Sequence, residues 1–70
     1  MEYVFTEHVN YRIGKRNLMT FEVIDVIKNS DVTLKYKRKF HARKFIGRGT
    51  VEVVYTIEEK YINIITVYWL

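Results

Sequence analysis

Apolar and polar residues alternate most regularly over residues 50–70, and this alternation predicts a β-hairpin. Successive side chains of a strand point to opposite faces of a sheet, so every second residue shares a face. We expect eight residues to cover one side of the sheet: Val51, Val53, Tyr55, Ile57, Ile62, Ile64, Thr66 and Tyr68. The rest of the chain should pack on this apolar surface.

The register of the hairpin depends on its turn, and no Asn-Gly pair is present to fix that turn. A loop at residues 59–60 places Val54 opposite Ile65. The same register places Glu52 opposite Val67. The reverse face then also carries polar and aromatic residues, namely Thr56, Tyr61, Asn63 and Trp69. We expect this half-apolar face to be a working surface.

The N-terminal part of the chain predicts a short strand followed by a helix. The strand covers residues 3–6, and Thr6 can cap a helix over residues 7–17. At 100° per residue, Val9 and Ile13 form a narrow apolar line on this helix. That line should face the sheet.

A second helix and further strands are expected before the hairpin. Thr20 can cap the second helix, which residues 29–31 would end. Its buried face would consist of Val23, Ile24, Val26 and Ile27. The alternation returns over residues 32–40, where one face carries Thr33, Lys35, Lys37 and Lys39. Residues 41–46 predict another short strand, followed by a glycine turn at residues 47–49.

The resulting element order, β-α-α-β-β-β with residues 41–46 as an additional strand, predicts an α+β fold. In this fold two N-terminal helices pack on one face of a twisted antiparallel sheet. We expect the 70 residues to form a single domain, 1–70. A domain of this size has a small core, so a partner chain would help to stabilise it.

Composition excludes several kinds of site. The chain has no cysteine and only two histidines, so zinc sites built from Cys and His are absent. Its three glycines form no phosphate-binding loop. We therefore expect no metal and no cofactor. No signal-peptide core or membrane-length apolar run is present, so we expect a cytoplasmic protein without a membrane partner.

Charge is distributed unevenly along the chain, although the net charge is only +4. No acidic residue lies between Asp31 and Glu52, a segment that holds seven of the twelve basic residues. Six of these seven are our candidate nucleic-acid contacts: Lys35, Lys37, Lys39, Arg43, Lys44 and Arg48. Such clustering favours a polyanion or an acidic protein as partner. The alternative is that the lysines protect an edge strand from pairing with other molecules.

Several stretches together resemble a family of short bacterial and archaeal domains of unknown function. These stretches are the opening strand, the run His8-x3-Arg12-x3-Arg16, Leu-Met-Thr at residues 18–20, Val-Val-Tyr at 53–55 and Ile-Thr-Val-Tyr at 65–68. The likeness covers nearly the whole chain. The family is itself similar, in element order and size, to the BrnT and RelE/ParE-like toxins of toxin–antitoxin pairs.

The resemblance implies a small ribonuclease-like toxin with a RelE-like fold that grips RNA on the exposed face of its sheet. It also implies neutralisation by an antitoxin encoded nearby, while a homodimer is the other partnership to consider. RelE-like enzymes carry functional Arg and Tyr residues near the C-terminal strands. Here those strands offer Lys60, Tyr61 and Tyr68 but no arginine after Arg48, which departs from the pattern for ribosome-dependent cleavage.

Metal-independent RNA cleavage needs groups that exchange protons and cations that stabilise charge on the phosphate. His8, Arg12 and Arg16 recur every fourth residue, so they lie on one side of the first helix, and we expect Tyr11 on the opposite side. We assign catalysis to this row, because imidazole exchanges protons near neutral pH and arginine binds phosphate with several donors. His41 is a weaker candidate because it lies among basic residues. Two aromatic residues, Tyr61 and Tyr68, are candidates for stacking on bases.

Each of these residues also has a structural explanation. His8 can cap a helix, and Arg12 and Arg16 can pair with glutamates or with the C-terminal carboxylate. The alternative function is therefore a non-catalytic module that binds nucleic acid or an acidic protein. The sequence does not choose between these functions.

Overall fold

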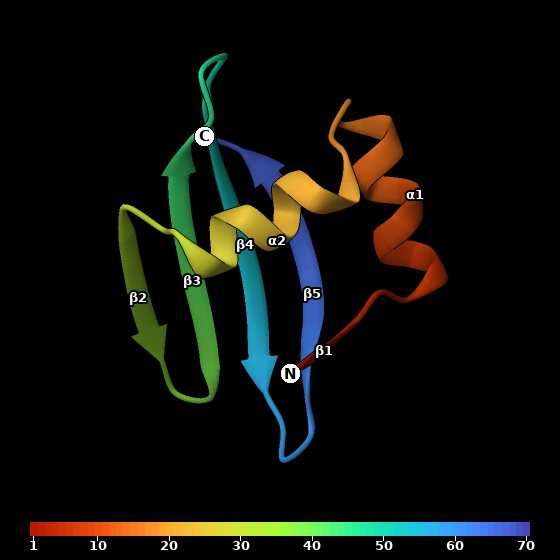
Figure 1. Cartoon of the computed structure of the whole chain (residues 1–70), viewed down its shortest axis with the longest axis vertical. Coiled ribbons are helices and arrows are strands. Elements are labelled where there is room, and N and C mark those ends of the chain that lie inside the picture. Colours follow the sequence, from red (N-terminus) through yellow and green to blue (C-terminus); the bar gives the residue numbers. More distant parts are fainter.

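A computed structural model describes residues 1–70 and contains two helices and five strands (Figure 1). The elements are β1 (Glu2–Val4), α1 (Glu7–Lys15), α2 (Thr20–Lys28), β2 (Val32–Tyr36), β3 (Lys39–Phe45), β4 (Thr50–Ile57) and β5 (Tyr61–Trp69). The strands form one sheet in the order β1-β5-β4-β3-β2. The predicted α+β fold with two N-terminal helices is confirmed, and the additional strand expected at residues 41–46 is present as β3. The sheet is mixed rather than wholly antiparallel, because β1 runs parallel to β5.

Both helices cover the same face of the sheet. α2 crosses in front of the strands and α1 lies beside β5 (Figure 1). The buried apolar side chains of the helices and of the central strands form a single cluster: Val9, Ile13, Leu18, Val23, Val26, Ala42, Val51, Val53, Tyr55, Ile62, Ile64 and Val67. We call the other face of the sheet, which carries no helix, the open face.

The two helices begin differently. Thr6 caps α1 as predicted, because its Oγ1 accepts a hydrogen bond from the backbone N–H of Val9 at 3.2 Å. Thr20, by contrast, is not a cap but the first residue of α2. The cap position belongs to Met19, whose backbone N–H donates to Oε1 of Glu22 at 2.9 Å. Glu22, in the first turn of α2, thus makes the side-chain hydrogen bond at the start of the helix that we expected Thr20 to make.

The end of α1 lies at Lys15, two residues before the predicted end. Asn17 adopts a left-handed conformation with φ of 61°, which stops the helix. Its N–H donates to the carbonyl of Gly14, and the N–H of Leu18 donates to the carbonyl of Ile13. These two bonds form a Schellman motif, and both apolar members of the motif belong to the core.

The strand predicted over residues 32–40 is wrong, because the chain turns back within it. Lys37 has a positive φ of 57° and belongs to the turn that connects β2 with β3. Tyr36 and Lys39 face each other across that turn. Lys35 lies opposite Phe40 and therefore on the other face from Lys39. The predicted face of lysines consequently does not exist.

The β4–β5 hairpin follows the predicted register only near its turn. Tyr55 lies opposite Ile64, as a loop at residues 59–60 requires. A β-bulge follows, because Val54 lies opposite Thr66 and leaves Ile65 without a partner. The predicted pairing of Val54 with Ile65 is therefore wrong.

The bulge exchanges the two faces of β5 beyond Ile65. Val67 is fully buried in the core, and Trp69 packs against the core on the same face. Thr66 and Tyr68, which we expected on the core face, instead point to the open face. Glu52 consequently lies opposite Tyr68 and not opposite Val67. A one-residue shift in register is enough to exchange every side chain of a strand between the two faces.

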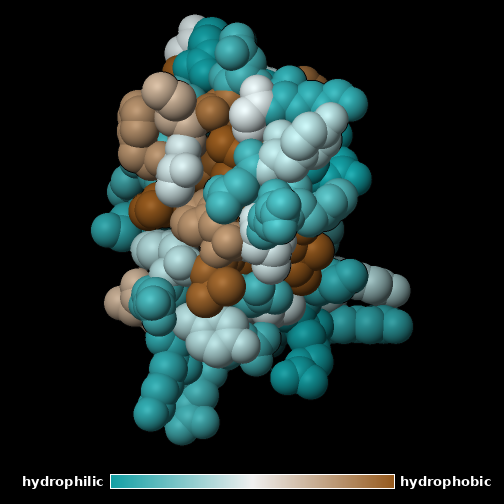
Figure 2. Space-filling model, turned by 90° about the vertical axis from the view of Figure 1, so that its right-hand side faces the viewer, coloured by the Kyte–Doolittle hydropathy of each residue, from teal (hydrophilic) through white to brown (hydrophobic).

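The surface is hydrophilic at one end of the molecule. Figure 2 shows long hydrophilic side chains extending from the lower end, where the β2–β3 and β4–β5 turns lie, and apolar atoms exposed above them. Neither helix has the length and apolar character that crossing a membrane requires.

Candidate active site

Of the residues that the sequence assigned to catalysis, His8 and Arg12 lie on α1, and Arg16 caps the C-terminal end of that helix. Nε of Arg12 donates a hydrogen bond to Nε2 of His8 at 2.8 Å. A cavity of about 260 Å³ is lined by these two residues together with Tyr11, Lys15 and Arg16. The expectation that Tyr11 points to the opposite side is wrong, because residues three and four apart on a helix are neighbours. The ammonium group of Lys15 lies 5.9 Å from the centre of the Tyr11 ring.

We call the five residues that line this cavity the α1 row. It is basic and contains no carboxylate; three of its members are exposed, and Arg12 and Arg16 are half-buried. None of its three cationic side chains forms an ion pair. The Nε2 lone pair of His8 already accepts the hydrogen bond from Arg12. The row can therefore attract an anion, but its imidazole has no buried acid to orient it.

The six predicted nucleic-acid contacts do not form one surface. Three of them are paired with carboxylates: Arg43 with Glu52, Lys44 with Asp25 and Arg48 with Glu22. The other three lie at the tip of the β2–β3 hairpin, together with Arg38. We call Lys35, Lys37, Arg38 and Lys39 the hairpin cations; all four are exposed and none forms an ion pair.

Arg48 has a structural role. Its terminal nitrogens donate to the two carboxylate oxygens of Glu22 at 2.6 and 3.1 Å, and to the carbonyl of Asn17 at 2.9 Å. The hydrogen bond from Arg48 holds the pKa of Glu22 below its usual value. The guanidinium also lies 5.4 Å from the Trp69 ring. Arg48 thus joins the β3–β4 loop to α2, to the segment between the two helices and to the end of β5.

The open face holds a cluster around a buried carboxylate. Nε of Arg43 donates to Oε1 of Glu52 at 2.5 Å, and Nδ1 of His41 lies 3.1 Å from Oε2. The hydroxyl of Tyr68 also donates to Oε2. The Glu52 side chain is 3% exposed, whereas those of His41 and Arg43 are 29% and 42% exposed. We call these four residues the Glu52 cluster.

Adjacent strands bring the Glu52 cluster together. His41 and Arg43 are two residues apart on β3, so both point to the open face. Glu52 on β4 lies opposite Arg43 on one side and opposite Tyr68 on the other. The bulge at Ile65 determines the orientation of Tyr68, so the cluster depends on an irregularity in the sheet.

Glu52 is held as an anion. Burial by itself would raise the pKa of this carboxyl, but the hydrogen bonds from Arg43 and His41 lower it further than burial raises it. Because Nδ1 of His41 is engaged by the carboxylate, Nε2 of the imidazole stays available. Arg43 uses Nε on Glu52, which leaves its two terminal nitrogens available. The cluster therefore places an imidazole nitrogen and a guanidinium group side by side on the open face.

Sequence reasoning missed the role of Glu52 and ranked His41 below His8. One signal was present, since Glu52 is the only charged residue among the apolar residues of its strand. The two candidate stacking residues differ in the structure. The Tyr68 hydroxyl is bound to Glu52, whereas Tyr61 is an exposed residue at the start of β5.

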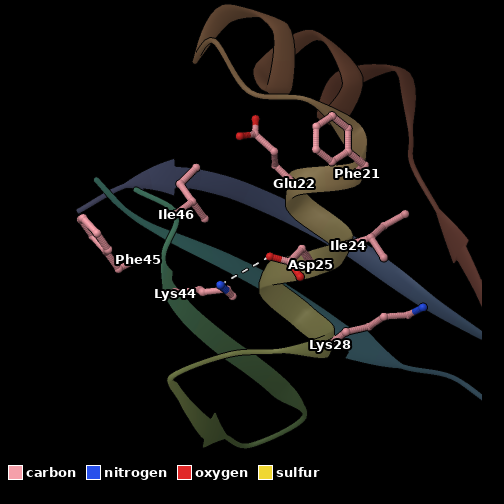
Figure 3. A pocket seen from close by; sticks show the side chains of 8 residues that line it. All are labelled: Phe21, Glu22, Ile24, Asp25, Lys28, Lys44, Phe45 and Ile46. Atoms are coloured by element: carbon pink, nitrogen blue, oxygen red, sulfur yellow. Dashed lines mark ion pairs between the residues drawn. The ribbon is translucent and has the colours of Figure 1, made fainter. Parts of the chain in front are cut away.

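The largest cavity lies elsewhere, between α2 and the end of β3 (Figure 3). It measures about 550 Å³ and is lined by Phe21, Glu22, Ile24, Asp25, Lys28, Lys44, Phe45 and Ile46. An ion pair of 3.5 Å between Lys44 and Asp25 spans it (Figure 3). The cavity contains no histidine, and two of its four charged residues neutralise each other.

No group of three or more His, Cys, Asp or Glu side chains is placed to hold a metal ion. A family model described as a domain of unknown function (DUF4258) matches residues 5–69. No curated protein and no solved structure matches the chain.

Proposed function

Because the chain belongs to the DUF4258 family of domains of unknown function, whose description assigns no activity, we propose a function from the geometry of the Glu52 cluster. The proposal is a metal-independent endoribonuclease of the toxin type. The observation that carries it is a buried, ionised glutamate that orients a histidine and an arginine on the open face of the sheet.

In the proposed reaction, Nε2 of His41 takes the proton of a ribose 2′-hydroxyl. The 2′-oxygen then attacks the neighbouring phosphorus, and the bond from phosphorus to the 5′-oxygen breaks. The leaving 5′-oxygen takes a proton from water, and the hydroxide that remains takes the proton of the 2′-hydroxyl back from the imidazolium of His41. The products are a 2′,3′-cyclic phosphate and a free 5′-hydroxyl, so no metal or redox partner enters the balance.

The remaining members of the cluster have supporting roles in this proposal. The terminal nitrogens of Arg43 face the phosphate and stabilise the charge that develops on it. Glu52 positions both His41 and Arg43, and its negative charge stabilises the imidazolium that forms. Tyr68 donates to Oε2 of the carboxylate, the oxygen that His41 also contacts, and so helps to hold Glu52 in place. DNA lacks the 2′-hydroxyl and would not be cleaved.

The toxin aspect of the proposal rests on the resemblance to BrnT and RelE/ParE-like toxins, which is one of element order and size. It implies a cytoplasmic protein that is neutralised by an antitoxin encoded beside it. The small core supports the idea of a partner, since twelve buried residues make up the whole apolar cluster.

A second function is favoured by a separate observation, the four unpaired hairpin cations. They can bind RNA by phosphate contacts without any chemistry. Binding of this kind weakens steeply with salt and does not depend on either histidine.

The two histidines allow a matched test of the site. We would measure cleavage of a single-stranded oligoribonucleotide by His41→Ala and His8→Ala, and follow the cyclic phosphate product. His41→Ala should lose at least about 100-fold in rate, which corresponds to roughly 2.7 kcal/mol of barrier. Both variants must show the unfolding transition of the wild type.

The possible outcomes distinguish the Glu52 cluster from the other candidate sites and functions. Loss of cleavage in His8→Ala, with full activity in His41→Ala, would place catalysis on the α1 row with Arg12 and Arg16. Wild-type protein that binds the RNA at low salt without cleaving it would be a binding module. Growth arrest on expression, relieved by the product of the neighbouring gene, would support the toxin role.

A further inference from the structure

The edge strand β2 is the most exposed element of the sheet. It pairs only with β3, and all five of its residues are exposed. Three of them are apolar and point to the open face: Val32, Leu34 and Tyr36 are 49%, 48% and 67% exposed. Leu34 lies opposite His41, so this apolar strip borders the Glu52 cluster.

A free edge of this kind usually carries a device that prevents pairing with other chains. Here the charged residues are concentrated at the tip of the hairpin, and Lys35 is the only charged residue within β2 itself. The outer backbone N–H and C=O groups of the strand remain available. An added strand would pair with them and could bury Val32, Leu34 and Tyr36 under its own alternate side chains.

The charge around this edge specifies the chemistry of the added strand. The hairpin cations adjoin the edge and have no carboxylate partner. The nearest acid at the other end of the strand, Asp31, already accepts a hydrogen bond from the backbone N–H of Phe45 at 2.9 Å. We propose that β2 is the docking edge for an acidic partner strand, in which carboxylates alternate with apolar side chains.

Two other occupants fit less well. A second copy of this chain would offer its own β2, which contains a lysine and no acid. RNA satisfies the cations but offers no row of backbone amides and carbonyls to the edge. An acidic strand can form ion pairs with the hairpin cations and backbone hydrogen bonds with β2.

The position of the edge also implies regulation. A partner strand along β2 would lie beside His41 and cover the approach of RNA to the open face. This consequence rests on the proposed function, whereas the docking itself does not.

The test uses two synthetic peptides of seven residues, one alternating valine with glutamate and the other alternating valine with lysine. Amide hydrogen exchange of the full chain is measured with and without each peptide. The acidic peptide at saturation should slow exchange of the outward amides of β2 at least about tenfold, and the lysine peptide should leave them unchanged.

Matched variants test whether the hairpin cations contribute to binding of the acidic peptide. Arg38→Gln should weaken binding of the acidic peptide several-fold, and Lys60→Gln, in the β4–β5 turn, should leave it unchanged. Leu34→Thr, which keeps a strand-forming residue, should also weaken it.

Three results would contradict the proposal that β2 is the docking edge. The acidic peptide could protect β1 and leave β2 unprotected, or the two peptides could bind equally well. The amides of β2 could also become protected without any peptide as the protein concentration rises, which would indicate pairing between copies of this chain. Protection of β2 by an oligoribonucleotide and not by the acidic peptide would make the edge an RNA contact. None of these measurements involves cleavage, so they fail or succeed independently of the ribonuclease.

Discussion

Replacing Glu52 by glutamine should destabilise the domain and change how its stability depends on pH. The carboxylate is the acceptor for three donors, from Arg43, His41 and Tyr68. Glutamine has nearly the same shape but offers one acceptor oxygen. Its amide group would point a donor at another donor, so at least one buried hydrogen bond is lost together with the charge.

The magnitude follows from how exposed the partners are. A hydrogen bond to a charged group contributes about 1.5–3 kcal/mol, and three are affected. Water can replace part of this, because His41 and Arg43 are 29% and 42% exposed. We therefore expect a loss of about 2–4 kcal/mol at pH 7. A domain of this size has a total stability on the order of 5 kcal/mol, so the variant would be close to unfolding.

The pH dependence has a definite sign. The pKa of Glu52 is lower in the folded state than in the unfolded chain, where a glutamate titrates near about 4.3. The stability that its charge provides is fully present above that value and is lost as the pH falls through the lower pKa of the folded state. The difference between wild type and Glu52→Gln should therefore shrink on acidification.

Urea unfolding of wild type and variant at several pH values between 7 and 3 measures this difference. Glu59→Gln is the matched control, because Glu59 is exposed and forms no ion pair or side-chain hydrogen bond. Glu22 also has a lowered pKa, but it is present in both proteins and cancels in the comparison. A difference below about 1 kcal/mol at pH 7, or one that stays constant as the pH falls, would refute the reasoning.

Three further substitutions test the fold by urea unfolding. Ile64→Ala, at a position 1% exposed, should cost about 2–5 kcal/mol, and a loss below about 1 kcal/mol would show that Ile64 is not a core residue. Gly49→Ala should cost about 2–3 kcal/mol, because φ is 152° and a Cβ would lie 2.9 Å from the Trp69 ring; unchanged stability would contradict both the backbone conformation and the close approach of the ring. Lys37→Asn should stabilise the protein by about 0.5–1 kcal/mol, since asparagine tolerates the left-handed conformation; a loss would contradict the turn.

Periodicity predicted those parts of the fold in which the backbone is regular. Val9 and Ile13 on α1, and Val23 and Val26 on α2, were expected in the core and are buried there. The pattern holds on α1, whereas on α2 Ile24, which was also expected in the buried face, is half-buried and lines the cavity beside β3. The period of two likewise identified β4 and the first part of β5.

The irregular parts could not be predicted from the same patterns. A bulge inserts one residue without any change in local composition, so the sequence around Ile65 gives no signal for it. The turn at Lys37 lacks the glycine or asparagine that usually accompanies a positive φ. The bulge explains why Tyr68 was not expected beside Glu52, whereas His41 and Arg43 meet Glu52 through the regular pairing of β3 with β4.

The position of β5 in the sheet has a consequence for biosynthesis. β5 follows every other element in the sequence, yet it lies between β1 and β4 and supports α1. Until it leaves the ribosome, the parallel pairing of β1 cannot form, and Tyr68 cannot reach Glu52. At about 5–20 residues per second, the nine residues of β5 take roughly 0.5–2 s to synthesise. During that interval the nascent chain would hold His41 and Arg43 without a complete cluster, so any activity of the open face would begin only after this strand has been translated.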